Sequence, residues 1–187
     1  MEIRRLDIPD VIIIKPRKFG DHRGFFSETY NKAAFAEAGI NVDFVQDNHS
    51  FSAPKGTVRG LHFQIAPAAQ TKLVRVTRGA ILDVAVDIRR GSPTYGKHVS
   101  TVISADEWNQ IYLPVGFAHG LCTLEPNTEV LYKVSDLYSP QHDRGLLWND
   151  PALGIEWPVG GDEVVLSEKD RLHPTLAELP EYFRYQG

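Results

Sequence analysis

Short segments in which apolar and polar residues alternate recur along this sequence, and they constrain its fold more than any other feature. In residues 80–88, one set of alternate positions holds Leu82, Val84, Val86 and Ile88, and the other holds Asp83, Ala85 and Asp87. Successive side chains of a strand point to opposite faces, so the apolar face can pack against a core. Similar segments lie at 44–51, 57–63, 72–77, 98–103, 110–113, 120–124 and 129–135. Their dense spacing predicts an all-β sandwich or barrel.

One segment has the features of a well-bounded helix. Asn31 can cap its start, residues 33–38 are mostly helix formers, and Gly39 can adopt the left-handed conformation that ends a helix. We expect a further short turn at 167–170 and a loop over the barrel at 151–158. The chain of 187 residues contains no internal repeat or linker. We therefore expect one domain over residues 1–187.

Composition and charge exclude several classes of function. A formal net charge of −4 gives no basic face for nucleic acid. No apolar run approaches the roughly 20 residues that cross a bilayer, and the apolar stretch Val11 to Ile14 is far shorter than a signal-peptide core of about 7–15 residues. Cys122 is the single cysteine, which excludes an intramolecular disulfide and a thiolate metal cluster. We expect a cytoplasmic protein with Cys122 buried.

Two motifs resemble those of the cupin family. Gly56 precedes His62 by six residues, and residues 114–119 read Pro-x-Gly-x-x-His, ending at His119. The resemblance implies a cupin-type jelly-roll barrel with a few short helices and with both histidines at its interior mouth. A metal-binding cupin would have a second histidine where this chain has Gln64 and an acidic ligand near Lys72. An ammonium group opposes cation binding, so we expect a site without metal.

Longer stretches resemble the dTDP-4-dehydrorhamnose 3,5-epimerase family, which is part of the cupin superfamily. They read DHRGFFSET (21–29), RGLHFQ (59–64), QTKLVRVTRG (70–79), DVAVDIRRGSPTYG (83–96), LPVGFAHG (113–120), YK (132–133), WNDPALGIEWP (148–158) and LSEKD (166–170). The match follows the chain in order over nearly its whole length. It implies an enzyme that inverts carbons 3 and 5 of dTDP-4-keto-6-deoxy-glucose, a precursor of dTDP-L-rhamnose, without any cofactor.

This reaction needs a base, a cation for the enolate oxygen and an acid on the opposite face of the sugar. His62 is the candidate base, because imidazole titrates near neutral pH. The resemblance implies that Asp170 orients His62, that Lys72 stabilises the enolate oxygen, and that Tyr132 returns the proton. Apart from the family context, these residues could equally be a barrel histidine, a surface carboxylate, a solvated lysine and a packed aromatic.

The resemblance also implies a set of substrate-binding residues. They are Arg23, Glu28, Gln46, Asn48, Arg59, Lys72, His119, Tyr138, Asp143 and Lys169. A guanidinium pairs well with phosphate oxygens, so Arg23 and Arg59 are candidates for the pyrophosphate, and Tyr138 could stack on the nucleotide. The family commonly has a glutamate where this chain has Asp143. The resemblance further implies a homodimer in which N-terminal strands are exchanged between subunits.

Several alternatives remain open from the sequence. The same base, cation and acid would serve an enzyme that inverts only carbon 3 or only carbon 5, and the spacing does not distinguish thymine from uracil. An enzyme that moves the ketone between carbons 3 and 4 fits the full set of residues less well. A metal-dependent oxygenase conflicts with Gln64 and Lys72. A non-catalytic sugar-nucleotide binding module would not need the base and the acid.

Overall fold

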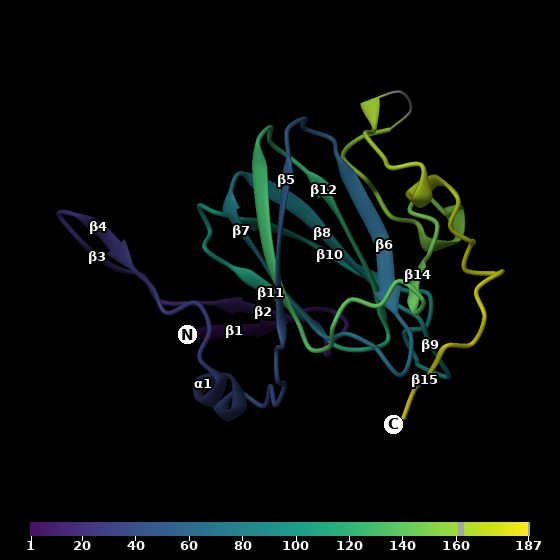
Figure 1. Cartoon of the computed structure of the whole chain (residues 1–187), viewed down its shortest axis with the longest axis horizontal. Helices are drawn as coiled ribbons and strands as arrows, with labels where there is room; N and C mark the ends of the chain where they lie inside the picture. Colours follow the sequence, from purple (N-terminus) through teal and green to yellow (C-terminus); the bar gives the residue numbers. More distant parts are fainter. Residues whose placement is uncertain (161–162, 187) are drawn as a thin grey trace.

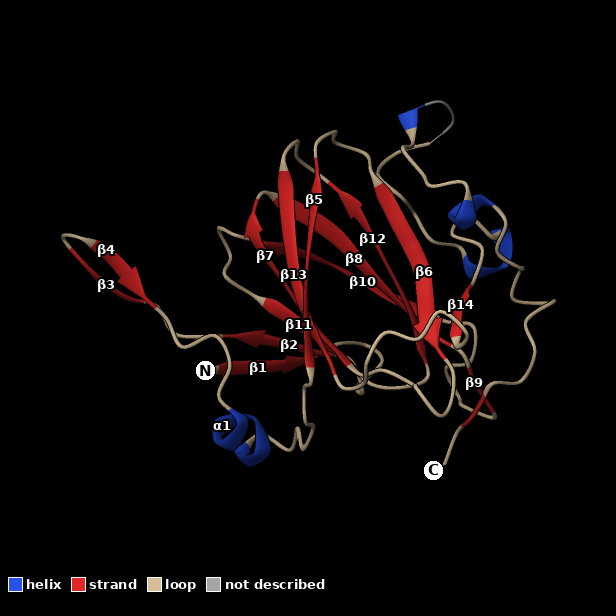
Figure 2. Cartoon of the chain, in the orientation of Figure 1, coloured by secondary structure: helices blue, strands red, loops and turns tan. Residues whose placement is uncertain are grey.

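The computed structural model describes residues 1–160 and 163–186 and arranges most of the strands in two facing sheets (Figures 1 and 2). The first sheet has the order β1 (Glu2–Arg5), β2 (Ile12–Lys15), β11 (Gln110–Leu113), β7 (Lys72–Arg78), β13 (Thr128–Val134) and β5 (Gln46–Ser52). The second has the order β10 (His98–Ser104), β8 (Ala80–Asp87), β12 (Phe117–Thr123), β6 (Val58–Gln64) and β14 (Asp143–Gly145). All pairs within these two sheets are antiparallel, as in a jelly roll.

The predicted all-β fold is confirmed, and every segment predicted as a strand forms one, with ends that differ by a few residues. The predicted helix is α1 (Lys32–Glu37), where the Asn31 side chain accepts a hydrogen bond from the Ala34 amide at 3.2 Å. The turn expected at 167–170 is a 3-10 helix, η3 (Lys169–Arg171), and the loop at 151–158 opens with another, η1 (Pro151–Leu153). Cys122 is buried, as expected.

Several strands were not predicted from the sequence, because apolar and polar residues do not alternate in them. In β2 the run Ile12, Ile13 and Ile14 is apolar throughout, because its side chains are buried on both faces of the sheet. The remaining ones are only two to four residues long, namely β1, β3 (Phe19–Asp21), β4 (Gly24–Phe26), β9 (Arg89–Arg90), β14 and β15 (Phe183–Arg184). A pattern of period two is not visible in two or three residues, and β1 has a single apolar residue, Ile3.

The alternation in β8 has a different meaning from the one expected, because both faces of this strand are buried. Ile81 and Ala85 belong to the core between the two sheets, and Asp83 shares their face. The apolar face, with Val84 and Val86, packs instead under the C-terminal part of the chain. That layer contributes Leu146, Leu153 and Leu179. The polar positions of the strand, rather than the apolar ones, thus mark the interior of the barrel.

Two other features determine where functional side chains lie. The C-terminal segment crosses the outer face of the second sheet, and it brings η3 against β6 (Figure 1). The β3–β4 hairpin projects away from the two sheets near the N-terminus (Figure 1). Its Phe19, Phe25 and Phe26 are each more than half exposed. Among the described residues, no helix is long and apolar enough to cross a membrane.

Candidate active site

The mouth of the barrel holds a cavity of about 460 Å³ between the two sheets. A neighbouring hollow of about 280 Å³ shares part of its wall. The predicted residues that line the cavity are Arg59, His62, Lys72, His119, Tyr132, Lys169 and Asp170, and those that line the hollow in addition are Gln46, Asn48, Tyr138 and Asp143. Only Arg23 and Glu28, of all the residues predicted for the site, do not line either space.

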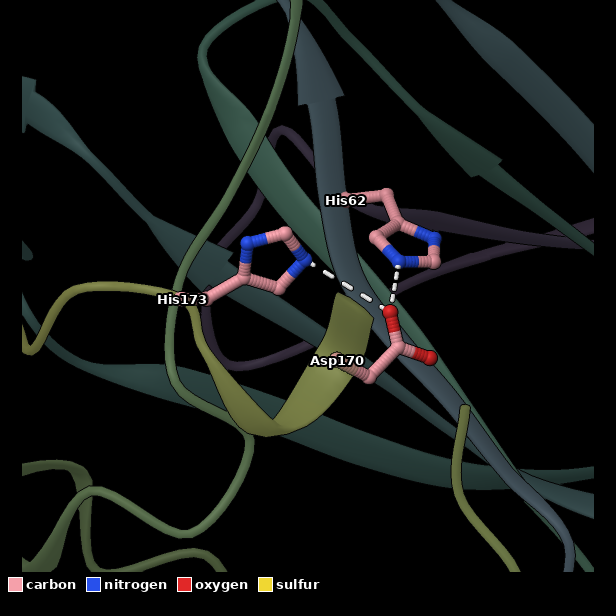
Figure 3. A group of neighbouring side chains, drawn as sticks. All are labelled: His62, Asp170 and His173. Carbon is pink, nitrogen blue, oxygen red and sulfur yellow. Dashed lines mark hydrogen bonds and ion pairs between the residues drawn. The ribbon is translucent and has the colours of Figure 1, made fainter. Parts of the chain in front are cut away.

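The centre of the site is a hydrogen-bonded pair, His62 and Asp170 (Figure 3). His62 Nε2 lies 2.6 Å from Asp170 Oδ1. A carboxylate oxygen can only accept, so Nε2 carries the proton and Nδ1 keeps a free lone pair. In Figure 3 this second nitrogen is on the side of the ring that faces away from His173. The pairing therefore sets the tautomer in which His62 can act as a base.

The local structure holds Asp170 in place. Its side chain is 4% exposed and comes from η3, at the start of which the Asp170 amide donates to Ser167 Oγ at 3.2 Å. Asp170 Oδ2 accepts from the Gly60 amide at 3.4 Å. Gly60 must be a glycine, because a Cβ there would lie 2.6 Å from the Gly120 Cα atom.

The surroundings adjust both pKa values in the directions that catalysis requires. Burial lowers the pKa of His62, against the opposing effect of Asp170, and the Lys72 ammonium lowers it further. His62 is therefore neutral at pH 7. Burial alone would raise the pKa of Asp170, but its contacts with His173 and His62 outweigh that effect and hold this pKa well below its usual range. Asp170 is thus ionised and available to stabilise an imidazolium.

Lys72 begins β7 and reaches across the cavity toward β6. Its Nζ atom donates to the His62 carbonyl at 3.3 Å. Burial lowers the pKa of Lys72 to about 8, although the charges of Asp143 and Asp83 partly oppose this shift. The group is therefore mainly cationic at pH 7. A buried ammonium beside the base can stabilise a negative charge that develops on a bound ketone oxygen.

Tyr132 faces the cavity from the opposite sheet. It belongs to β13 in the first sheet, whereas His62 belongs to β6 in the second, and both line the two spaces. Burial raises the pKa of the Tyr132 hydroxyl, although the charge of Arg59 opposes the shift. The phenol is therefore protonated at neutral pH. A base on one wall and a proton donor on the other form the arrangement that inversion of a carbon centre requires.

The residues at the cupin metal-ligand positions have other partners here. His119 Nε2 lies 2.8 Å from Asp83 Oδ2, and both side chains are buried. The amide of Gln64 donates to the Ala68 carbonyl at 2.7 Å and to the Leu137 carbonyl at 3.1 Å. Gln64 is thus bound to the loop that leads to Tyr138 and does not point a ligand atom into the cavity.

One group in the described part of the chain, His62, Asp170 and His173, has its ligand atoms within 4.8 Å of one another (Figure 3). Atoms that each lie about 2.0–2.2 Å from a tetrahedral zinc ion are separated by roughly 3.3–3.6 Å. The 2.6 Å contact between His62 and Asp170 is shorter than this. We therefore interpret the group as a hydrogen-bonded cluster.

Polar residues in the neighbouring hollow form a chain of contacts. Asp143 is paired with Lys169 and accepts from the Tyr138 hydroxyl at 3.4 Å. The Tyr138 amide donates to Gln46 Oε1 at 2.9 Å, and Gln46 in turn donates to Asn48 Oδ1 at 2.8 Å. Tyr138 is 56% exposed. Its ring is therefore accessible to a flat ligand that enters from solvent.

Arginines lie at two different places. Arg59 is at the edge of the cavity, where its guanidinium donates to Ser52 Oγ and to the Phe51 carbonyl, each at 3.2 Å. Arg23 lies in the turn of the β3–β4 hairpin and pairs with Asp21. Glu28 follows the hairpin and is exposed. In this single chain, the site therefore has Arg59 but not Arg23 or Glu28.

Two residues of the site were missed by the sequence analysis. Asp83 is the partner of His119, and its inward direction was encoded in the alternation of 80–88, where the apolar face was taken as the core. His173 lies 3.5 Å from Asp170, three residues further along the chain. The spacing is visible in the sequence, but a 3-10 turn is needed to bring the two side chains together.

The comparisons with known proteins agree with this geometry. The model of the dTDP-4-dehydrorhamnose 3,5-epimerase family matches residues 5–178. This chain belongs to that family. It is 55% identical over 185 residues to the dTDP-4-dehydrorhamnose 3,5-epimerase of Sinorhizobium fredii, an alignment that covers 99% of this chain and 94% of the relative. Members of this family are epimerases. This chain is therefore an isomerase of deoxysugar metabolism.

Two solved structures are similar over nearly the whole chain. The 3,5-epimerase from Bacillus anthracis, with TDP and PPi bound, has a TM-score of 0.90 and 50% identity and covers 93% of this chain and 98% of its own. The dTDP-6-deoxy-D-glucose-3,5-epimerase from Legionella pneumophila, in complex with dTDP-4-keto-L-rhamnose, has a TM-score of 0.94 and 41% identity and covers 100% and 99%. The jelly-roll fold is therefore the fold of these epimerases.

Proposed function

We propose that this protein inverts carbons 3 and 5 of dTDP-4-keto-6-deoxy-glucose by removing a proton next to the ketone and returning one from the opposite face. The observation that carries the proposal is the placement of His62 and Tyr132 on opposite sheets of one cavity. The relatives that share about half of this sequence are named as 3,5-epimerases, which favours inversion at both carbons. The chain supplies every group that the reaction needs.

The reaction begins with His62 Nδ1, the nitrogen left free by the bond to Asp170. It takes the proton from the carbon next to the ketone, and the electron pair moves onto the ketone oxygen as an enolate. The Lys72 ammonium stabilises this oxygen, since a well-placed donor in such a site contributes on the order of 3 kcal/mol. Asp170 stabilises the imidazolium that forms.

Reprotonation completes the inversion. The Tyr132 hydroxyl gives its proton to the carbon from the wall opposite His62, and the enolate returns to the ketone. The His62 imidazolium then releases its proton to solvent and the Tyr132 phenolate takes one up, so that both groups are restored before the next step. We propose that the same groups act at carbons 3 and 5 in turn, because each carbon flanks the same ketone. Neither step requires a metal or an organic cofactor.

The nucleotide end of the substrate would occupy the hollow beside the cavity. We propose that Tyr138 stacks on the base, that Lys169 and Arg59 pair with the pyrophosphate, and that His119 binds the sugar. The carboxylate of Asp143 positions Lys169 and Tyr138. Gln46 and Asn48 add polar contacts along the same wall.

Proton exchange in deuterated water tests the reaction. The purified protein is incubated with dTDP-4-keto-6-deoxy-glucose, and the ring protons are followed by NMR. Deuterium at both carbons 3 and 5 is the expected result. His62→Ala should abolish the exchange, with Lys133→Ala, outside the cavity, as a matched control. An absence of exchange in the wild-type protein, or wild-type exchange in His62→Ala, would contradict the mechanism.

We also propose that the protein is a homodimer with exchanged N-terminal strands. The projecting β3–β4 hairpin carries phenylalanines that are exposed in the single chain, and exposed apolar surface of this kind is typical of an interface. In such a dimer, Arg23 and Glu28 would reach the cavity of the partner subunit. The proposal accounts for the distance of both residues from the cavity of their own chain.

A heterodimer distinguishes this arrangement from a self-contained site. One subunit carries Arg23→Ala and the other His62→Ala, and the mixed dimer is purified with two different tags. If hairpins are exchanged, one of the two sites has both wild-type residues and about half of the activity returns. If each hairpin serves its own chain, both sites lack a residue and the mixed dimer is as inactive as the parents.

We propose that residues 1–187 act as one cytoplasmic domain. No nucleic acid or membrane takes part in the reaction, and the substrate is a small soluble sugar nucleotide. Fractionation of the native host followed by immunodetection would test the location.

A further inference from the structure

A second histidine lies against the carboxylate of the catalytic pair (Figure 3). His173 Nε2 is 3.5 Å from Asp170 Oδ1, the same oxygen that His62 Nε2 contacts at 2.6 Å. The two imidazole rings meet edge to face, with centroids 5.6 Å apart and an angle of 81° between their planes. One carboxylate oxygen therefore faces two imidazole nitrogens.

The structure holds His173 in this place from two directions. Its side chain is only 10% exposed and does not line the substrate cavity. The ring packs on Gly145, where a Cβ would lie 2.3 to 2.4 Å from three ring atoms. Gly145 stands directly opposite His62 in the β6–β14 pair. The Leu147 amide also donates to the Pro174 carbonyl at 2.8 Å, which fixes the backbone next to His173.

His173 Nε2 is buried and has no hydrogen-bond partner among the described residues, and its 3.5 Å contact with Asp170 Oδ1 is an ion-pair contact. A buried N–H without a partner is costly, and Asp170 Oδ1 is the acceptor that faces this nitrogen. The contact is longer than an ideal hydrogen bond, so His173 competes for the oxygen without displacing His62. His173 lines neither the cavity nor the neighbouring hollow, so its contact with the site is through Asp170.

We propose that His173 is a positioning residue that shares the Asp170 carboxylate with His62 and keeps His62 neutral and ready to act as the base at neutral pH. The inference rests on the proposed function for its catalytic meaning. A carboxylate oxygen that serves one imidazole favours the protonated form of that imidazole. When a second N–H contacts the same oxygen, the stabilisation of the protonated form is divided between the two rings.

Charged groups around the pair shift the pKa of His62 in both directions. The groups that act on His62 are Asp170 from η3, Lys72 from β7 and Asp143 from β14. Lys72 lowers the pKa of His62, while Asp170 and Asp143 raise it. His173 itself faces Asp170 and the edge of the His62 ring. Replacing His173 by another ring keeps most of the burial of His62 and changes the share of Asp170 that acts on His62.

The test compares His173→Phe, which keeps a ring but lacks a donor, with His173→Gln, which keeps an amide donor. The imidazole of His62 is titrated by ¹⁵N NMR, and the deuterium exchange rate is measured at pH 6 and pH 8. We expect His173→Phe to raise the pKa of His62 by about half a unit. The ratio of the rate at pH 6 to that at pH 8 should then fall by up to about 2.5-fold, since the pKa of His62 lies below its usual value. His173→Gln should restore part of both changes.

A second variant reaches the same contact without altering the histidine. Gly145→Ala places a methyl group where the His173 ring lies and should reproduce the effect of His173→Phe. Gly160→Ala is the matched control, because a Cβ there meets nothing within 4 Å. If His173→Phe does not fold, Gly145→Ala decides the question.

The two proposals fail in different ways. If wild-type protein does not exchange deuterium, the proposed function fails, while the NMR titration of His62 still measures the effect of His173. If wild-type protein exchanges normally and the pKa of His62 is the same in the folded variants, His173 is only a packing residue and the inference is overturned.

Discussion

Raising the pH from 7 to 9 should remove the positive charge of Lys72 and with it the stabilisation of the enolate. With a pKa of about 8, roughly 90% of Lys72 is charged at pH 7 and roughly 10% at pH 9. Because only the charged form stabilises the oxygen, kcat/KM should fall about tenfold over this range. His62 accounts for the acidic limb of the pH–rate profile, because activity falls when its imidazole is protonated. The pKa of His62 is lowered from its usual value, so this limb lies at low pH.

The assay is the initial rate of deuterium incorporation from pH 5 to pH 10, with the exchange of substrate in buffer alone subtracted at each pH. Ionisation of the Tyr132 phenol does not contribute to the fall in rate between pH 7 and pH 9, because burial raises its pKa from a value already near 10. Lys72→Arg is the matched variant. A guanidinium stays charged throughout, so the basic limb should move beyond pH 10 even if the rate is lower.

A basic limb at the same pH in wild-type protein and in Lys72→Arg would refute this reasoning, because the titrating group could not then be Lys72. So would a rate that is constant up to pH 10 in the wild-type protein. If Lys72→Arg does not fold, a titration of the Lys72 side chain by ¹³C NMR measures its pKa directly. A value near 10.5 would contradict the effect of burial on which the prediction depends.

Three further substitutions test other contacts. Asp170→Asn removes the charge that fixes the tautomer of His62, and exchange at both carbons should fall by about 10²- to 10⁴-fold while circular dichroism stays unchanged. Tyr132→Phe should leave exchange measurable at one or both carbons but block inversion, which chiral analysis of the product would detect; full inversion would exclude Tyr132 as the acid. Asp83→Ala leaves the buried nitrogen of His119 without a partner, and urea denaturation should show a loss of about 1–3 kcal/mol in the free energy of unfolding.

Much of the architecture could be predicted because it is local. Alternation of apolar and polar residues over seven or eight positions predicts a strand where one face of the strand is solvent-exposed or polar, as in β7 and β13. The cap at Asn31 acts within one turn, so α1 was also predictable. The short strands β9, β14 and β15 form only because the rest of the chain supplies a partner at their position. Nothing in two or three residues encodes that partner.

The site was predictable in its members but not in its contacts. The family resemblance identified His62, Asp170, Lys72 and Tyr132, and the structure brings all of them to one cavity. Asp83 and His173 were missed, because each acquires its importance from a residue far away in sequence or across a turn. Arg23 and Glu28 lie outside the cavity of their own chain, and the proposed dimer is needed to give them a role.

The sequence by itself determined the strand pattern and the helix cap, since each depends on local backbone preference, and its resemblance to the family supplied the candidate reacting groups. Only the tertiary structure decided which face of β8 points inward, which nitrogen of His62 is free, and how far burial lowers the pKa of Lys72. These properties depend on distance and on the exclusion of water. Both are fixed when the two sheets and the C-terminal segment pack together.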